Sequence, residues 1–153
     1  MPGLELRVPP LLVGAFFAGA MFVLAKLLPQ LSVPVPLRAP LVVVFLAVGA
    51  AIALGGVVAF RRHRTTVNPL NPDASSSMVI TGIYRVSRNP MYLGFLLFLA
   101  AWAVHLSNAA SALLLPGFVV YMNRFQIQPE EKTLLAKFGA AFADYMSHVR
   151  RWV

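Results

Sequence analysis

The stretch GIYRVSRNPMYLG, Gly82 to Gly94, places two arginines, two tyrosines and an Asn-Pro pair directly before a long uncharged run. Asn89 suits the N-cap of a helix and Pro90 suits its first position, so this pattern predicts a helix that begins at Pro90. On that interpretation Arg85 and Arg88 are ordinary anchors at a membrane surface. The tyrosines favour a further role, although tyrosine is also common at membrane interfaces.

The uncharged run that follows extends from Asn89 to Asn123 and is 35 residues long. At about 1.5 Å per helical residue it is too long for one membrane span and slightly short for two. The pair Ser107-Asn108 lies near its centre, where a turn would fall. We therefore predict a helical hairpin, with helices over 90–106 and 109–127.

The composition of the whole chain agrees with a membrane protein. It has 153 residues, of which 59% are hydrophobic and 12% charged, whereas a soluble domain carries about 25% charged residues. The net charge of +8 favours anionic lipid headgroups over nucleic acid as a partner, because the apolar runs are long enough to enter lipid. The absence of cysteine excludes disulfides, a cysteine nucleophile and cysteine-based zinc sites, and we predict no metal site.

Two further apolar runs complete the predicted topology, with spans near 8–28 and 39–60 joined by a proline-rich loop. The chain is then a single all-α membrane domain of about four transmembrane helices, with a loop over 61–89. Eleven of the 13 lysines and arginines fall on the side of that loop and both termini, leaving Lys26 and Arg38 on the other side. The positive-inside rule assigns the richer side, and all five acids with it, to the cytoplasm.

The C-terminal part of the chain, over 129–150, is predicted to form an amphipathic helix rather than a span. Apolar residues recur there at helical spacing with charges between them: Leu134, Leu135, Phe138, Phe142, Tyr145, Met146 and Val149. Such a helix would lie over the cytosolic end of the bundle.

The four-span topology brings two polar clusters to the same end. Arg88, Asn89 and Tyr92 open the third span, and Glu130 and Glu131 follow the fourth. Either cluster alone has a structural explanation, since carboxylates at a helix start complement the helix dipole. Together they offer a cation, an aromatic face and a carboxylate pair, which suits a zwitterionic ligand with an extra positive charge.

These motifs resemble those of the membrane methyltransferases of the isoprenylcysteine carboxyl methyltransferase and phospholipid methyltransferase type. The resemblance covers roughly residues 61–153 and rests on an ordered series of stretches: GIYRVSRNPMYLG, PEEKTLLAKFG, Tyr145 and VRRW, with TTVNP at 65–69 and VITG at 79–82 similar to bacterial members. Asn89 stands where eukaryotic members have histidine, so it keeps a hydrogen-bond donor but cannot act as a base.

The resemblance implies an enzyme that uses S-adenosylmethionine in a bacterial inner membrane, with both termini cytoplasmic. It implies catalytic roles for Arg88 and Glu131, with Glu130 and Glu131 both closing the cofactor site and Glu131 favoured for the bond to the cofactor's amino or ribose groups. The residues implied in cofactor binding are Tyr84, Arg88, Asn89, Pro90, Tyr92, Gly94, Glu130, Glu131 and Tyr145. Tyr84 and Tyr145 are expected to cover the adenosine.

The acceptor and two alternative functions stay open at this stage. The acceptor is expected to be small or lipid-like, with either a carboxylate, which needs no base, or an amine, which must first lose a proton. One alternative is an NADPH-dependent membrane reductase of related architecture. The other is a small membrane protein without enzymatic activity, in which the arginine and glutamate clusters are only caps and anchors.

Overall fold

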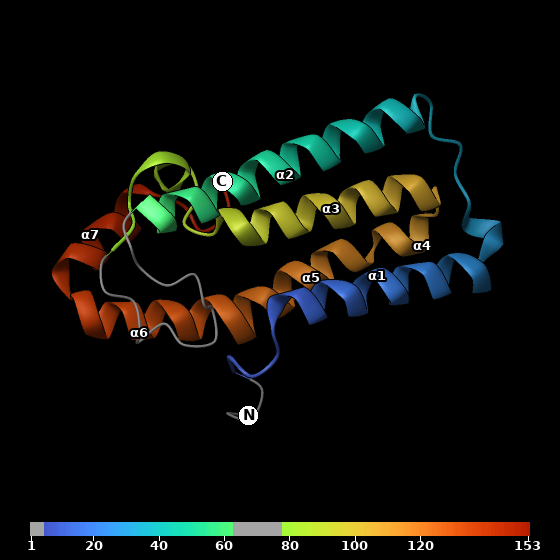
Figure 1. Ribbon diagram of the computed structural model, residues 1–153. Coiled ribbons are helices and arrows are strands. Elements are labelled where there is room, and N and C mark those ends of the chain that lie inside the picture. The colour runs from blue at the N-terminus through green and yellow to red at the C-terminus, as the bar shows by residue number, and fades with distance from the viewer. Residues whose placement is uncertain (1–4, 63–77) are drawn as a thin grey trace.

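The computed structural model describes residues 5–62 and 78–153, and its regular elements there are helices (Figure 1). They are, in order, α1 (Pro10–Leu27), η1 (Pro29–Leu31), α2 (Arg38–Arg62), η3 (Gly82–Arg85), α3 (Pro90–Leu106), α4 (Ala109–Ala112), α5 (Leu114–Met122), η4 (Asn123–Ile127), α6 (Gln128–Phe138) and α7 (Ala140–His148). The prediction of an all-α chain is confirmed. The TTVNP motif at 65–69 and most of the predicted 61–89 loop lie outside the described residues.

Helix α3 is the central element of the bundle. It packs against α2 on one side and against α1 and α5 on the other (Figure 1). Helix α6 continues the direction of α5, and α7 then turns back toward the start of α3 (Figure 1). We call the end that carries Arg88, Glu130, Glu131 and Arg151 the polar end, and the opposite end, with Ser107 and Asn108, the turn end.

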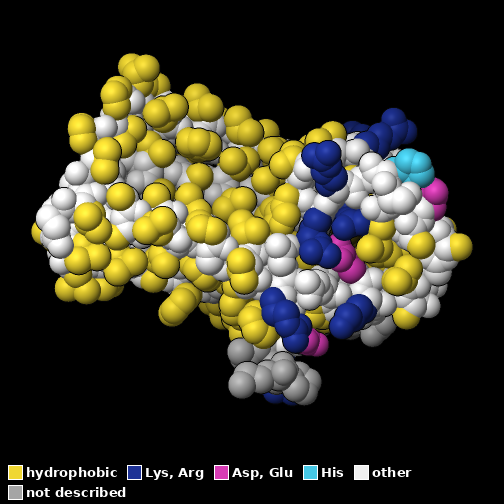
Figure 2. All heavy atoms as spheres, turned by 180° about the vertical axis from the view of Figure 1, so that it is seen from behind, with side chains coloured by type: hydrophobic (Ala, Val, Ile, Leu, Met, Phe, Trp, Pro, Cys, Tyr) yellow, Lys and Arg dark blue, Asp and Glu magenta, His cyan; other side chains and the backbone are white. Residues whose placement is uncertain are grey.

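Two helices, α1 and α2, are long and apolar enough to cross a membrane, whereas the apolar α3 is shorter at 17 residues. The core helix of a soluble protein would be mostly buried, but only 17% of the apolar window of α1 and 11% of that of α2 are buried. Hydrophobic side chains cover most of the face shown in Figure 2, and its charged side chains gather toward the polar end. The described surface is therefore suited to lipid.

Close packing joins α2 to α3 through small residues. A Cβ atom added at Gly94 would lie 2.8 Å from the Cβ of Ala53 and 2.9 Å from the carbonyl oxygen of Gly49. A Cβ at Gly56 would lie 2.9 Å from the side chain of Met91. Small residues of this kind let helix backbones approach closely in membranes, where the hydrophobic effect does not drive helices together.

We expect Gly94→Ala to lower the free energy of unfolding by about 1–3 kcal/mol, because the new methyl group must push α2 and α3 apart. Gly14→Ala is the matched control, since a Cβ at Gly14 meets nothing within 4 Å and alanine favours the helix. Thermal unfolding in detergent, followed by circular dichroism, measures both. Equal melting temperatures for the two variants would contradict the close packing at Gly94.

The hairpin turn lies where the uncharged run predicted it, at Ser107-Asn108. Ser107 has a left-handed backbone (φ 49°) and ends α3, and the side-chain oxygen of Asn108 accepts a hydrogen bond from the backbone N–H of Ser111. The Asn108 side chain also donates to the carbonyl of Leu28 (2.8 Å), and the backbone N–H of Val33 donates to that of Ser107 (2.8 Å). The turn is thus tied to the α1–α2 connection.

The junction between α5 and α6 differs from the separate fourth span that we predicted. The helix does not end at residue 127, but passes through the π-helical segment η4 into α6. Pro129 has no N–H to donate to the carbonyl of Phe125, four residues earlier. Instead, the backbone N–H of Leu6 donates a hydrogen bond to the carbonyl oxygen of Phe125, at 3.0 Å. The residues before α1 therefore complete a helix near the other end of the chain.

The C-terminal part also differs from the single helix predicted over 129–150. It consists of α6 and α7, which are separated at Gly139. Gly139 has φ 55° and ψ −130°, a conformation that residues with a Cβ rarely adopt, so the first helix ends there. The change of direction lets α7 return toward α3, which a continuous helix could not do.

Candidate functional site

The start of α3 and the start of α6 meet at the polar end, as the four-span topology predicted. The phenol of Tyr92 donates a hydrogen bond to Glu130 Oε2 at 3.2 Å. The guanidinium of Arg88 lies 2.9 Å from Glu131 Oε1. Residues about 40 positions apart in the sequence therefore form one polar cluster. Figure 2 shows acidic side chains bordered by basic ones at this end of the molecule.

Glu131 is held by two arginines. Besides the contact from Arg88, Arg151 donates from Nε to Glu131 Oε1 at 3.1 Å and from Nη2 to Oε2 at 2.6 Å. The side chains of Glu131 and Arg88 are only 12% and 10% exposed, and that of Arg151 is 31% exposed. A bidentate, charge-assisted contact between an arginine and a carboxylate is among the strong hydrogen-bonding contacts of proteins. Both oxygens of Glu131 are therefore engaged.

Arg88 connects α3 to the C-terminal part of the chain. Its Nη1 donates to the carbonyl of Met146 at 3.1 Å, and its backbone N–H donates to that of Arg150 at 3.0 Å. Its Nε is buried and has no hydrogen-bond partner within the described part of the chain. A buried donor without a partner is costly, so this N–H is a candidate contact for an acceptor on a ligand.

Asn89 occupies the N-cap position of α3, but its side chain makes no capping bond to that helix. Its Nδ2 instead donates to the carbonyl of Arg151 at 3.0 Å, and its backbone N–H donates to the hydroxyl of the buried Ser87. In this structure the amide of Asn89 cross-links two distant segments. This hydrogen bond needs only a side-chain N–H donor, which histidine also has. It does not need a side chain that titrates.

The two tyrosines expected over the adenosine are adjacent in the structure. The hydroxyl of Tyr145 donates to the carbonyl of Tyr84 at 2.7 Å, and the Tyr84 ring lies edge-on to Phe60 at 5.4 Å. Burial raises the pKa of the Tyr145 hydroxyl to about 12 and that of Tyr84 further, so both stay neutral at physiological pH. They offer aromatic surface rather than charge.

The remaining two residues expected to bind the cofactor are in α3. Pro90 is the first residue of the helix and is buried. Gly94 faces the close contact with α2 described above. Its lack of a side chain is explained by helix packing.

Glu130 has the unusual ionisation behaviour in this cluster. Burial raises the pKa of its carboxyl from 4.5 to about 7, opposed by the hydrogen bond from Tyr92 and reinforced by the neighbouring charge of Glu131. A carboxyl group with such a pKa is near half-ionised at pH 7, and it can accept a proton or pair with a cation there. The two consecutive acids thus have different environments: Glu131 is paired, and Glu130 faces a neutral phenol.

Two members of the cluster, Arg151 and Trp152, were not predicted as site residues. Arg151 holds Glu131, and the indole N–H of Trp152 donates to Asn123 Oδ1 at 3.1 Å. The only signal in the sequence was the VRRW motif itself, to which the family resemblance attached no role. No charge or periodicity pattern indicates which of Arg150 and Arg151 turns inward.

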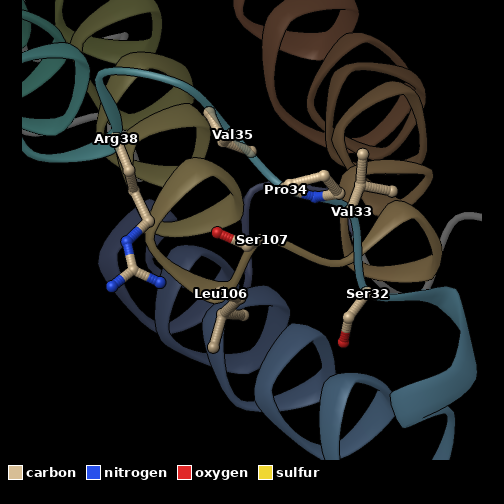
Figure 3. A pocket seen from close by; sticks show the side chains of 7 residues that line it. All are labelled: Ser32, Val33, Pro34, Val35, Arg38, Leu106 and Ser107. Carbon is tan, nitrogen blue, oxygen red and sulfur yellow. The ribbon is translucent and has the colours of Figure 1, made fainter.

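Two hollows elsewhere in the described structure lack such chemistry. One at the turn end, about 570 Å³, is open and shallow, and Arg38 is the one charged residue among those that line it (Figure 3). Another, about 580 Å³, lies along the apolar surface of α1 beside Leu114. The polar end is therefore the candidate active site.

The chain is similar to known proteins over much of its length. Residues 37–141 match the family model described as phospholipid methyltransferase. An uncharacterized protein of Haemophilus influenzae is 43% identical over 63 residues, which are 41% of this chain and the whole of that protein. Protein-S-isoprenylcysteine O-methyltransferase A of Arabidopsis thaliana is 30% identical over 109 residues, 69% of this chain and 54% of that protein.

A third relative is Methanethiol S-methyltransferase 2 of Bradyrhizobium diazoefficiens, 37% identical over 67 residues, 44% of this chain and 25% of that protein. The matched region thus spans about half the length of the Arabidopsis enzyme and a quarter of the Bradyrhizobium one. No solved structure matches the chain significantly.

Proposed function

Because the chain belongs to the phospholipid methyltransferase family of membrane methyltransferases, we propose that it methylates a small or lipid-like acceptor with S-adenosylmethionine at the cytosolic face of a membrane. The observation that carries the proposal is the meeting of Arg88 and Tyr92 with Glu131 and Glu130 at one end of an apolar bundle. This cluster combines cations, carboxylates and an aromatic ring outside the apolar surface.

The proposed membrane arrangement is a single domain with four crossings. Helices α1 and α2 form the first pair, α3 the third crossing, and the successive segments α4, α5 and η4 over 109–127 the fourth. The polar end then faces the cytosol, and the basic residues around it contact anionic headgroups in a bacterial inner membrane. Helix α6 extends from the fourth crossing into the cytosol, and α7 covers the site.

The residues at the polar end fit the charges of S-adenosylmethionine. Its carboxylate needs donors, and the buried Nε of Arg88 offers one without losing an existing contact. Its ammonium and sulfonium groups need negative charge or aromatic surface, and Glu130 and Tyr92 offer both. Tyr84 and Tyr145 would bind the adenosine, with Pro90 and Asn89 shaping the wall beside them. Gly94 would act only through the packing of α3.

Glu130 and Glu131 have different roles in this proposal. We expected Glu131 to contact the cofactor, but both of its oxygens are bonded to arginines, so the same geometry makes Glu130 the more available carboxylate. Glu131 would then keep Arg88 in position, and Glu130 would face the ligand. Exchanging the roles of the two acids leaves the set of site residues unchanged.

The cofactor supplies a methyl group on a positively charged sulfur. The protein's contribution is to align the acceptor with that group and to exclude water, because an in-line displacement depends mainly on positioning. A carboxylate acceptor is nucleophilic at neutral pH and needs no base. For an amine, or a thiol of the kind named for the Bradyrhizobium relative, Glu130 would be the carboxylate that accepts the departing proton.

Isothermal titration of the purified protein with S-adenosylmethionine tests this function, in detergent and in lipid nanodiscs. We expect saturable binding that NADPH does not compete with. Binding of NADPH instead would favour a reductase, and absence of binding to both ligands in detergent and in nanodiscs would favour a protein without enzymatic activity.

We expect the affinity for S-adenosylmethionine to rise with pH between about 5.5 and 7, because the cationic ligand favours the ionised form of Glu130, whose pKa is about 7 in the free protein. Well below that pKa the affinity should change by up to about tenfold per pH unit, since binding then releases one proton. Titrations in buffers of different ionisation enthalpy measure the proton released. Glu130→Gln is the control and should give a flat profile. A wild-type profile as flat as that of the variant would contradict the proposed contact.

A further inference from the structure

Residues 149–152 follow the end of α7 without forming a helix and contact the residues just before α3, and we call them the strap. Val149 has extended backbone angles (φ −118°, ψ 130°). The carbonyl of Arg150 accepts from the backbone N–H of Arg88, and that of Arg151 accepts from the side chain of Asn89. The strap therefore provides backbone acceptors to the two residues that precede α3.

The side chains of the strap reach two other elements. Arg151 binds both oxygens of Glu131 at the start of α6. Trp152 donates to Asn123 in η4 and packs against the main hydrophobic core. One short segment thus contacts η4, α6 and the two residues that precede α3, and these parts of the chain lie beside the phenol and both acids of the site.

Arg151 also determines the net charge of the group that it forms with Arg88 and Glu131. Arg88 and Glu131 alone would form a neutral, nearly buried pair. With Arg151 the three side chains carry one net positive charge, beside an Arg88 Nε that has no partner among the described residues. These three side chains can therefore accept one anionic group without losing the contacts that hold them together.

From these contacts we propose that Arg151 is a positioning residue: through Glu131 it fixes Arg88 for the cofactor's carboxylate, and it holds the strap closed over the site. The inference rests on the proposed function for its ligand, but the closed strap is a property of the protein alone. Loss of Arg151 should release the strap, leave Glu131 with one partner and let the cofactor dissociate faster.

The test uses Trp152 as a reporter. The chain has two tryptophans, so Trp102→Phe leaves Trp152 as the single fluorophore. In that background Arg151→Gln is compared with Arg150→Gln, which removes the same charge one position earlier. The side chain of Arg150 is exposed and takes part in none of these contacts, and the substitution keeps its main-chain carbonyl.

Without cofactor, we expect acrylamide to quench Trp152 more strongly in Arg151→Gln than in Arg150→Gln. With S-adenosylmethionine, stopped-flow fluorescence should show dissociation about tenfold faster in Arg151→Gln, the effect expected when one partner of a hydrogen-bonded charge pair is removed. Arg151→Lys keeps the charge but loses the two-pronged contact, so it should fall between the wild type and Arg151→Gln.

Two results would overturn the proposal: equal quenching in Arg151→Gln and Arg150→Gln, or equal dissociation rates in these variants. If the wild type binds no S-adenosylmethionine, the proposed function fails, and the quenching comparison still decides whether Arg151 holds the strap. Circular dichroism checks that each variant is folded. If Arg151→Gln does not fold, Arg151→Lys gives the same readouts.

Discussion

Glu131→Gln should lower the free energy of unfolding by about 3 kcal/mol, the cost of breaking a buried ion pair by removing one partner. The substitution takes the counter-ion from both Arg88, which is 10% exposed, and Arg151. An amide cannot replace it, because its nitrogen would be placed against a guanidinium. Binding of S-adenosylmethionine should fall with stability, since Arg88 is then no longer held in place.

The matched control for Glu131→Gln is Glu5→Gln. Glu5 also pairs with an arginine, Arg124, at 2.6 Å, but the two side chains are 30% and 44% exposed. Exposed ion pairs contribute about 1 kcal/mol or less. Thermal unfolding in detergent and titration with the cofactor measure both variants. Equal losses of stability in the two would show that Glu131 is not the buried anchor described here.

Glu130→Gln should separate stability from binding. Burial raises the pKa of Glu130 from 4.5 to about 7, so its ionisation in the folded protein opposes folding. Wild-type stability should therefore fall as pH rises from about 4.5 to about 7, by about 3 kcal/mol in total. Glutamine does not ionise and its oxygen can still accept from Tyr92, so the variant should lose this pH dependence and be more stable at pH 7.5.

Binding should change in the opposite direction in Glu130→Gln. Affinity for S-adenosylmethionine at pH 7.5 should fall on the order of 100-fold, because the carboxylate that faces the cation is gone. Melting curves between pH 4.5 and 8, combined with titration calorimetry, test both effects. A variant that is less stable than the wild type at pH 7.5 would disprove the proposed ionisation of Glu130, and one with unchanged affinity would remove Glu130 from the cofactor site.

The parts of the fold that were predictable from the sequence depend on chain length and charge. The uncharged run of 35 residues required a turn near its centre, and α3 has the predicted bounds of 90–106. A hairpin returns its two ends to the same side, so Arg88 and Glu131 had to be close. Neither conclusion requires knowledge of any individual side-chain contact.

The parts that were not predictable depend on single tertiary partners. Helix α6 continues through Pro129 because Leu6 supplies a donor from the other end of the sequence. The break at Gly139 was missed because the apolar spacing continues across it. The sequence does not indicate which of Arg150 and Arg151 binds Glu131. That choice depends on the path of the strap in the fold, which directs the side chain of Arg151 toward Glu131.

The donation from Leu6 to Phe125, together with the strap, has a consequence for biogenesis. Residues 5–8 reach η4 from one direction and Trp152 from another, so the polar end joins segments that are far apart in the sequence. Pairing over such sequence distances is slow compared with local helix formation. Helices can therefore form locally first, and we expect the proposed site to be complete only after residues 150–152 have docked against α6 and η4.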